Sequence, residues 1–206
     1  MARYRGPKNR IARRFGANLF GRKRNPLLHK NNPPGMHGAR RRKKSDYGLQ
    51  LEEKQKLKAV YGMLGEQQLV GYYRKAFSLK GNTMDNFQAL LECRLDNLVY
   101  RLKFAPTIFA AQQLVSHGHI LVDGKKVDVR SFQVRPGMVI SIREKSRKIG
   151  FINECLEDTM RETPSFLQCD AKNYSGQLLA VPQPEEVSLP VEINIAEVCE
   201  FLAHTT

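Results

Sequence analysis

Positive charge is distributed very unevenly along this chain. The first 50 residues contain 15 Lys and Arg residues and one acid, Asp46, whereas residues 51–206 contain 19 residues of each sign. Because so basic a segment repels itself in water, we predict that residues 1–44 form an extended basic N-terminal arm, ordered by a polyanionic partner. A solvated tail is the alternative. The net charge of +14 over 206 residues favours nucleic acid as the partner.

The charge of the remaining chain changes sign near residue 149. Residues 94–148 contain 11 basic and 4 acidic residues, and residues 149–206 contain 2 basic and 10 acidic residues. No stretch approaches the roughly 18 apolar residues of a membrane span, and no apolar core follows the basic start as in a signal peptide. We therefore predict a soluble protein that is not secreted, has no membrane partner and keeps the basic arm in its mature form.

Helical periodicity begins at Ser45. Apolar residues recur at positions 57, 60, 61 and 64, the spacing of one helical face, and two further stripes follow. We predict a small helical domain over residues 45–93, completed by an amphipathic helix within residues 190–206. Tyr72, Tyr73 and Phe77 have the spacing of a buried face, so we expect them in the core, with base stacking as the alternative.

A different pattern starts at Arg94. It consists of two apolar helical stripes, the second of which begins at Pro106-Thr107 and ends at Gly118. A short apolar run then meets a tight-turn signal at Asp123-Gly124, and an alternating run follows at residues 139–142. These signals predict two helices packed on a small antiparallel sheet.

The domain organisation follows from these patterns. We predict that residues 94–157 form the helix-and-sheet module, inserted in the helical domain, and that an acidic helix lies near residues 151–161. Residues 158–189 contain several prolines and are predicted as a loop-rich acidic connection. The predicted fold class is α+β.

Motifs of catalysis and metal binding are missing. The four cysteines include no CxxC pair, and there is no HExxH, GxGxxG or GxSxG motif. His117 and His119 flank Gly118 without an evident third metal ligand, so a structural or RNA-contacting role is favoured for both. We predict buried reduced thiols, no enzyme activity, no cofactor, no metal and no small-molecule substrate.

The basic residues of the module form two groups, one on its first helix and one around the hairpin and the last strand. Such groups can hold successive backbones of a structured RNA by its shape. Their matching acids lie in the C-terminal tail, which argues against a merely solvated face. The residues are Arg94, Arg101, Lys103, Lys125, Lys126, Arg143, Lys145, Arg147 and Lys148.

Four stretches carry a resemblance to a known family. They are MARYRGPK at residues 1–8, PPGMHGARRRKKSDYGLQLEEKQKLKAVYG at 33–62, RLDNLVYRLKF at 94–104 and QLVSHGHILVDGKKV at 113–127. The chain resembles the S-four family of small-subunit ribosomal proteins of the bacterial or plastid type. The resemblance implies a structural constituent of the small subunit and a primary rRNA-binding protein, which nucleates assembly at the five-prime-domain junction. It also implies that residues 94–157 are the RNA-binding module named after this family.

The resemblance further implies site residues and partners. Arg40, Arg41, Arg42, Lys43 and Lys44 would lie where messenger RNA enters and would contribute to translational accuracy. Small-subunit proteins three and five would be neighbours, on ribosomes in the cytoplasm or the plastid stroma. The implied rRNA-binding residues are Arg3, Arg5, Lys8, Arg10, Arg13, Arg14, Arg22, Ser45, Tyr47, Arg94, Asn97, Arg101, His117, His119, Lys125, Lys126, Arg143 and Lys145.

The chain departs from the family pattern in two places. Many relatives bind zinc through cysteines in the first fifty residues, where this chain has none. Ile108 and Gln112 stand where arginines are usual, which removes two expected phosphate contacts. Two other function classes are an RNA-modifying enzyme that borrows the same module and a free regulatory RNA or DNA binder. The short chain outside the module disfavours the enzyme.

Overall fold

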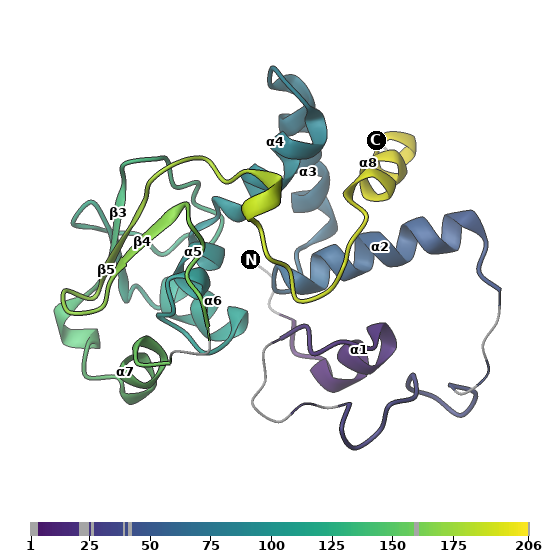
Figure 1. The fold of residues 1–206 in the computed structure, drawn as a ribbon, viewed down its shortest axis with the longest axis horizontal. Helices are drawn as coiled ribbons and strands as arrows, with labels where there is room; N and C mark the ends of the chain where they lie inside the picture. Colours follow the sequence, from purple (N-terminus) through teal and green to yellow (C-terminus); the bar gives the residue numbers. More distant parts are fainter. Residues whose placement is uncertain are drawn as a thin grey trace. The chain divides into compact units, whose positions relative to one another are not determined.

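The computed structural model describes residues 4–20, 25, 27–38, 40, 43–158 and 161–205. They belong to two compact units, which we describe separately. The first comprises Met1–Phe87 and Leu189–Thr206, and the second comprises Gln88–Ser188. Helices and an antiparallel sheet occupy mostly separate stretches of chain (Figure 1), so the predicted α+β class is confirmed.

The basic arm contains a helix where the sequence pattern predicted only loop. α1 (Lys8–Phe15) ends at Gly16, whose φ of +66° is a conformation that glycine adopts without steric cost. Ala12 is buried in this helix, and Leu19 and Phe20 are buried just after it. The arm therefore makes apolar contacts of its own, which its charge pattern did not reveal.

The helices predicted after Ser45 are confirmed. They are α2 (Asp46–Val60), α3 (Glu66–Ser78) and α4 (Thr83–Glu92). Ser45 caps α2, because its hydroxyl oxygen accepts a hydrogen bond from the backbone N–H of Gly48 at 3.3 Å. Leu57 of α2 and Leu69 of α3 are fully buried.

The predicted C-terminal helix is also present. α8 (Ile195–Thr205) packs along α2 and touches α3, as the yellow helix in Figure 1 shows. Asn194 begins this helix, and its side-chain oxygen accepts a hydrogen bond from the N–H of Ala196 at 3.1 Å. The backbone N–H of Asn194 donates to a carboxylate oxygen of Glu53 in α2, also at 3.1 Å. The first unit therefore joins segments from both ends of the chain.

One prediction about the helical core was wrong. Phe77 is 71% exposed, although its spacing on α3 is that of a buried face. Tyr73 is half-buried and meets Phe87 edge to face, with ring centroids 6.2 Å apart. Leu69 and Ala76 are the fully buried residues of α3. The apolar residues do lie along one side of α3, but only some of them are covered by the rest of the unit.

The second unit contains the two helices that the sequence predicted for the module. They are α5 (Leu95–Arg101) and α6 (Ile108–Ser116). Thr107 caps α6, because its hydroxyl oxygen accepts a hydrogen bond from the N–H of Ala110. Gly118 ends the turn after α6 with a φ of +70°. The apolar stripe of α5 is fully buried and forms the centre of this unit's core.

A five-stranded antiparallel sheet completes the second unit. Its strand order is β2-β1-β3-β5-β4. The strands are β1 (Ile120–Val122), β2 (Lys125–Lys126), β3 (Val139–Ile142), β4 (Leu167–Asp170) and β5 (Ser175–Leu178). Gly176 of β5 faces α5, and a Cβ there would collide with the methyl groups of Leu102. The absence of a side chain at this position lets helix and sheet pack closely.

The chain after β3 differs from the prediction. Residues 158–189 were expected to be mostly loop, yet β4 and β5 lie there and extend the sheet beyond β3. Leu167 and Leu178 are buried, but these strands are short and contain no β-branched residue, so their sequence signal was weak. The acidic helix near 151–161 is shorter than expected: α7 spans Gly150–Leu156, after a 3-10 turn η1 (Glu144–Ser146).

Candidate nucleic-acid interface

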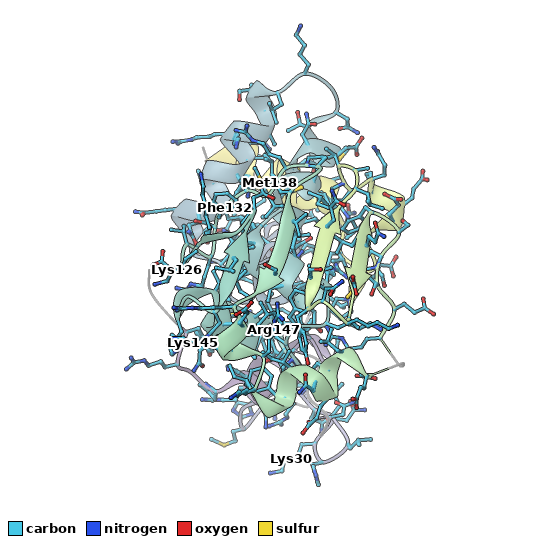
Figure 2. All side chains as sticks on the ribbon, turned by 90° about the vertical axis from the view of Figure 1, so that its left-hand side faces the viewer. Lys30, Lys126, Phe132, Met138, Lys145 and Arg147 are labelled. Atoms are coloured by element: carbon cyan, nitrogen blue, oxygen red, sulfur yellow. The ribbon has the colours of Figure 1, made fainter. Side chains whose placement is uncertain are left out.

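Basic side chains, all exposed except the half-buried Arg147, gather on three neighbouring segments of the second unit. The segments are the turn between α6 and β1, the β1–β2 hairpin and the chain that follows β3. In Figure 2, Lys126 and Lys145 lie toward the left of this unit and Arg147 lies near its centre. We call this group the basic surface. It consists of His117, Lys125, Lys126, Arg143, Lys145, Arg147 and Lys148.

The hairpin that carries two of these lysines has a fixed geometry. Asp123 and Gly124 both have left-handed backbone conformations, with φ of 47° and 77°, as in the tight turn that the Asp-Gly pair predicted. The side-chain oxygen of Asp123 accepts a hydrogen bond from the N–H of Val139 at 2.9 Å, which ties the turn to β3. Lys125 and Lys126 therefore project from a braced edge strand, and both are exposed.

Gly118 brings the hairpin and the preceding turn together. A Cβ on Gly118 would collide with the outer carbons of the Lys126 side chain, so the lysine lies directly over this glycine. The rings of His117 and His119 flank it, with centroids 6.1 Å apart. The sequence HGH thus provides both the left-handed turn and the space that positions Lys126.

His119 holds the third segment in place. One ring nitrogen of His119 lies 2.8 Å from the hydroxyl of Ser146, and its carbonyl accepts a hydrogen bond from the N–H of Arg143 at 2.9 Å. Burial, together with the nearby His117 and Arg143, lowers the pKa of His119. His119 is therefore neutral at pH 7 and positions Arg143, while His117 is the exposed histidine of the pair.

Arg147 is held by a strand pair that the sequence did not predict. Its guanidinium carbon lies 5.3 Å from the ring centroid of Tyr174, in the turn between β4 and β5. The Tyr174 hydroxyl lies 2.9 Å from a side-chain oxygen of Asn153, and Tyr174 has a φ of 51° that is rare for a tyrosine. The Nε of Arg147 is buried and has no hydrogen-bond partner among the described residues. Alternation of Leu167 with Cys169 was the one signal of this hairpin.

Arg94 was predicted to bind rRNA, and in the structure it lies inside the second unit. Its side chain is 2% exposed and donates two hydrogen bonds to the carboxylate of Asp96, at 3.0 and 2.7 Å. Gln112 also donates to Asp96 at 3.3 Å and accepts a hydrogen bond from Arg130. Gln112 and Ile108, the two departures from the family pattern, are both buried and would not face solvent.

Two further polar residues of the RLDNLVYR motif, the buried Asn97 and the half-buried Arg101, also have partners within the unit. Asn97 donates to a carboxylate oxygen of Glu92 at 2.6 Å, and Arg101 forms an ion pair with Glu92 at 3.0 Å. Arg101 also donates to the carbonyl of Ser188 at 2.7 Å. Lys103 is similarly engaged, through a hydrogen bond to the carbonyl of Asp158. These polar residues brace the unit, and charge counting missed this because Glu92 lies outside the motif.

The arm carries the remaining predicted cations. On α1, Arg13 donates to the carbonyl of Asn32 at 3.0 and 2.8 Å, and the Arg14 guanidinium lies 5.7 Å from the ring centroid of Phe15. Arg5 and Arg10 are exposed, and Lys8 is half-buried. Arg40 and Lys43 are exposed, and Lys44 forms an ion pair with Glu52. Arg3, Arg22, Arg41 and Arg42 lie outside the described residues.

The start of α2 carries two further predicted residues. Ser45 caps the helix through its hydroxyl and is exposed. Tyr47 is 64% exposed, and its ring centroid lies 5.3 Å from that of Phe201 in α8. Tyr47 therefore helps to hold the two helices together while most of its ring faces solvent.

The cysteines have the character of buried thiols. Cys93, Cys155 and Cys199 are buried and Cys169 is half-buried, and none forms a disulfide. Burial raises the pKa of Cys93 and Cys199 to about 11, with Glu92 adding to the effect at Cys93. Within the described residues, no three potential ligands are grouped to hold a metal ion. No helix in that part of the chain is long and apolar enough to cross a membrane.

Comparison with known proteins covers the whole chain. Residues 3–92 match the family described as ribosomal protein S4/S9 N-terminal domain, and residues 93–140 match the S4 domain. The small ribosomal subunit protein uS4 of Protochlamydia amoebophila is 70% identical over 206 residues, with both chains covered completely. The uS4 proteins of Chlamydia muridarum and Chlamydia trachomatis are 60% and 59% identical over 209 residues, again with complete coverage of both chains.

Proposed function

The chain belongs to the uS4 family of small ribosomal subunit proteins, and on this premise we propose that it is a structural, rRNA-binding constituent of the small subunit. The family consists of ribosomal structural proteins and is not an enzyme class. The observation that carries the proposal is the basic surface of the second unit. Among the described residues, none of its lysines and arginines has a carboxylate oxygen within 4 Å.

The arrangement of these cations suits recognition of a folded RNA by its shape. Phosphate contacts fix the register and orientation of a protein on a nucleic acid. Here the cations are braced in advance by the Asp123–Val139 hydrogen bond, by Gly118 and by the His119–Ser146 contact. Bracing lowers the conformational entropy that binding would otherwise lose. The basic surface therefore presents cations to the phosphates at fixed positions.

The finer role that we propose is nucleation of small-subunit assembly at the five-prime-domain junction of the rRNA. A protein that acts early needs a preformed folded surface and a means to neutralise closely packed phosphates. The second unit supplies the surface. The arm supplies the neutralisation, since α1 contains basic residues and no acid.

A second finer role concerns messenger RNA. We include in the proposal that residues 40–44 contact incoming messenger and contribute to translational accuracy. In support, Arg40 and Lys43 are exposed. Lys44 forms an ion pair with Glu52, so it is the weakest candidate among the three residues of this run that the structure describes. Small-subunit proteins three and five as neighbours, and ribosomes of the cytoplasm as location, rest on the family resemblance.

The experiment is a salt-dependent binding titration of the full chain. The RNAs are the five-prime-domain junction of small-subunit rRNA and a generic duplex of equal length. We expect a strong preference for the junction and, for about eight phosphate contacts, a log–log salt slope of about −5 to −7. A slope near −1, or equal affinity for both RNAs, would contradict the proposal.

Charge-neutralised variants then locate the interface. Lys125→Gln, Lys126→Gln and Lys145→Gln should each reduce the magnitude of the slope by about 0.7 to 0.9. Lys172→Gln is the matched control, because Lys172 is an exposed lysine of the same unit that lies in the acidic stretch. An equal effect of the control would show that net charge alone, and not the basic surface, governs binding.

A further inference from the structure

Phe77 is an exposed aromatic residue with a hollow beside it. A cavity of about 290 Å³ is lined by Tyr73, Arg74 and Phe77 of α3 and by Ala203 of α8. Phe77 is 71% exposed, the highest value among the exposed Phe and Tyr residues in the described part of the chain. A single exposed apolar residue is common on protein surfaces, so the observation that matters here is the open phenyl ring together with the hollow that it lines.

The walls of this hollow are firm. Tyr73 meets Phe87 at an interplanar angle of 82°, and Phe87 is fully buried, so the tyrosine ring is fixed. α8 packs on α2 and α3, which holds Ala203 in place as a small residue on the opposite wall. The Phe77 ring has no aromatic partner within the described chain. One aromatic face is therefore open beside a preformed cleft.

The charge beside the hollow is positive. Arg74 is exposed, and no carboxylate of the described residues lies within 4 Å of its guanidinium. Lys75 and Lys80 follow on α3 and in the turn after it, whereas Glu66 at the far end of α3 is paired with Lys54 and Lys58. An aromatic face with an unpaired guanidinium beside it complements a flat ring attached to a negative group.

We propose that this hollow binds an unpaired base of RNA, stacked on Phe77, with an adjoining phosphate held by Arg74. Every nucleobase has a π-face, and stacking on aromatic side chains is how proteins hold splayed-out single-stranded bases. An apolar protein segment would fill the cleft but would leave Arg74 without a counter-charge. The inference rests on the proposed function in one respect, that the RNA is small-subunit rRNA.

Substitutions at Phe77 test the stacking directly. The full chain is titrated with complete small-subunit rRNA, with a generic duplex as the reference RNA. We expect Phe77→Ala to weaken rRNA binding about 5- to 100-fold, Phe77→Trp to retain affinity, and Phe77→Leu to lose nearly as much as alanine. Retention by leucine would overturn the proposal, because leucine keeps the apolar contact and removes only the planar ring.

Two controls separate the possible failures. Leu179→Ala removes an exposed apolar side chain of the acidic stretch and should leave affinity unchanged. If the unmodified chain prefers rRNA and Phe77→Ala binds equally well, the present inference fails alone. If the unmodified chain shows no preference for rRNA, the proposed function fails. Because Phe77 is exposed, thermal unfolding should confirm that each variant is folded.

A photo-reactive phenylalanine analogue at position 77 identifies the occupant. In complexes with rRNA and in reconstituted small subunits, we expect cross-links to one or two neighbouring unpaired nucleotides. Cross-links to a protein neighbour in the subunit, without any to RNA, would assign the hollow to protein docking and overturn the proposal. Failure to cross-link to RNA in either preparation would also overturn it.

Discussion

Arg94 and Asp96 form a bidentate ion pair inside the second unit, with hydrogen bonds of 3.0 and 2.7 Å between the guanidinium and the carboxylate. Their side chains are 2% and 1% exposed. Asp96 also accepts hydrogen bonds from Gln112 and from the backbone N–H of Asn97. The carboxylate is thus the common partner of groups from two segments, and the burial of both charges makes the pair interdependent.

Asp96→Leu should destabilise the protein strongly. It removes the carboxylate that binds the buried Arg94 guanidinium, a loss that costs about 3–5 kcal/mol. Chemical denaturation of the variant measures the free energy of unfolding. The double variant Arg94→Met/Asp96→Leu should recover much of that loss, since it also removes the buried charge. Asp128→Leu, at an exposed position, is the control, and equal effects of the two single substitutions would refute the prediction.

Gly118→Ala should affect both stability and RNA binding. Alanine would have to adopt the left-handed backbone conformation of Gly118, and its Cβ would displace the side chain of Lys126. We expect a loss of about 1–2 kcal/mol in the free energy of unfolding, together with weaker rRNA binding. Gly150→Ala has open space around it and a helical position, so it should be neutral or slightly stabilising. If Gly118→Ala bound rRNA as tightly as the natural chain, Lys126 would not be part of the interface.

His119 should make stability dependent on pH. Since the folded state lowers the pKa of His119, the unfolded chain binds its proton more readily, and stability falls as pH drops below about 6.5. Above that pH the histidine is neutral in both states and adds no dependence. Unfolding free energies at pH 7.5 and 5.5 should therefore differ more for the natural chain than for His119→Gln. Parallel pH profiles would show that His119 does not titrate differently on folding.

Two lysines that share one carboxylate should differ in importance. Lys54 and Lys58 contact the two oxygens of Glu66 at 2.7 and 2.6 Å. Lys54 is more buried, and its Nζ lies 4.2 Å from the ring centroid of Phe201, which gives it a cation–π contact with α8. We expect Lys54→Ala to cost about 1–3 kcal/mol and Lys58→Ala about 0.5 kcal/mol, as measured by chemical denaturation. The reverse order would show that the Phe201 contact contributes little.

Local patterns predicted most of the elements correctly. Helices α2 to α6 and α8 follow from apolar spacing and from caps such as Ser45 and Thr107, which act within a few residues of the chain. The Asp123-Gly124 hairpin follows for the same reason. Strands β4 and β5 were missed because they are short and contain no β-branched residue, and because the pairing of β5 with β3 joins segments distant in sequence.

The residues of the candidate site could likewise be predicted only in part from the sequence. Charge along the sequence selected the hairpin lysines and Arg143, and the structure exposes all three, while their contact with rRNA stays a prediction. The same criterion included Arg94, which the structure buries, and Arg101, which pairs with Glu92. Asp96 is only two residues from Arg94, but charge counting does not show that the fold buries this pair, and the pairing of Arg101 with Glu92 joins residues nine apart.

The sequence by itself therefore determined the helices, the hairpin, the basic character of the arm and the family. These properties depend on spacing and residue type, which are local. Tertiary structure alone decided that Arg94 is internal, that Tyr174 holds Arg147, and that Phe77 stays in solvent despite its helical stripe. The physical reason is that burial depends on which distant segments cover a side chain, and neither spacing nor composition specifies that.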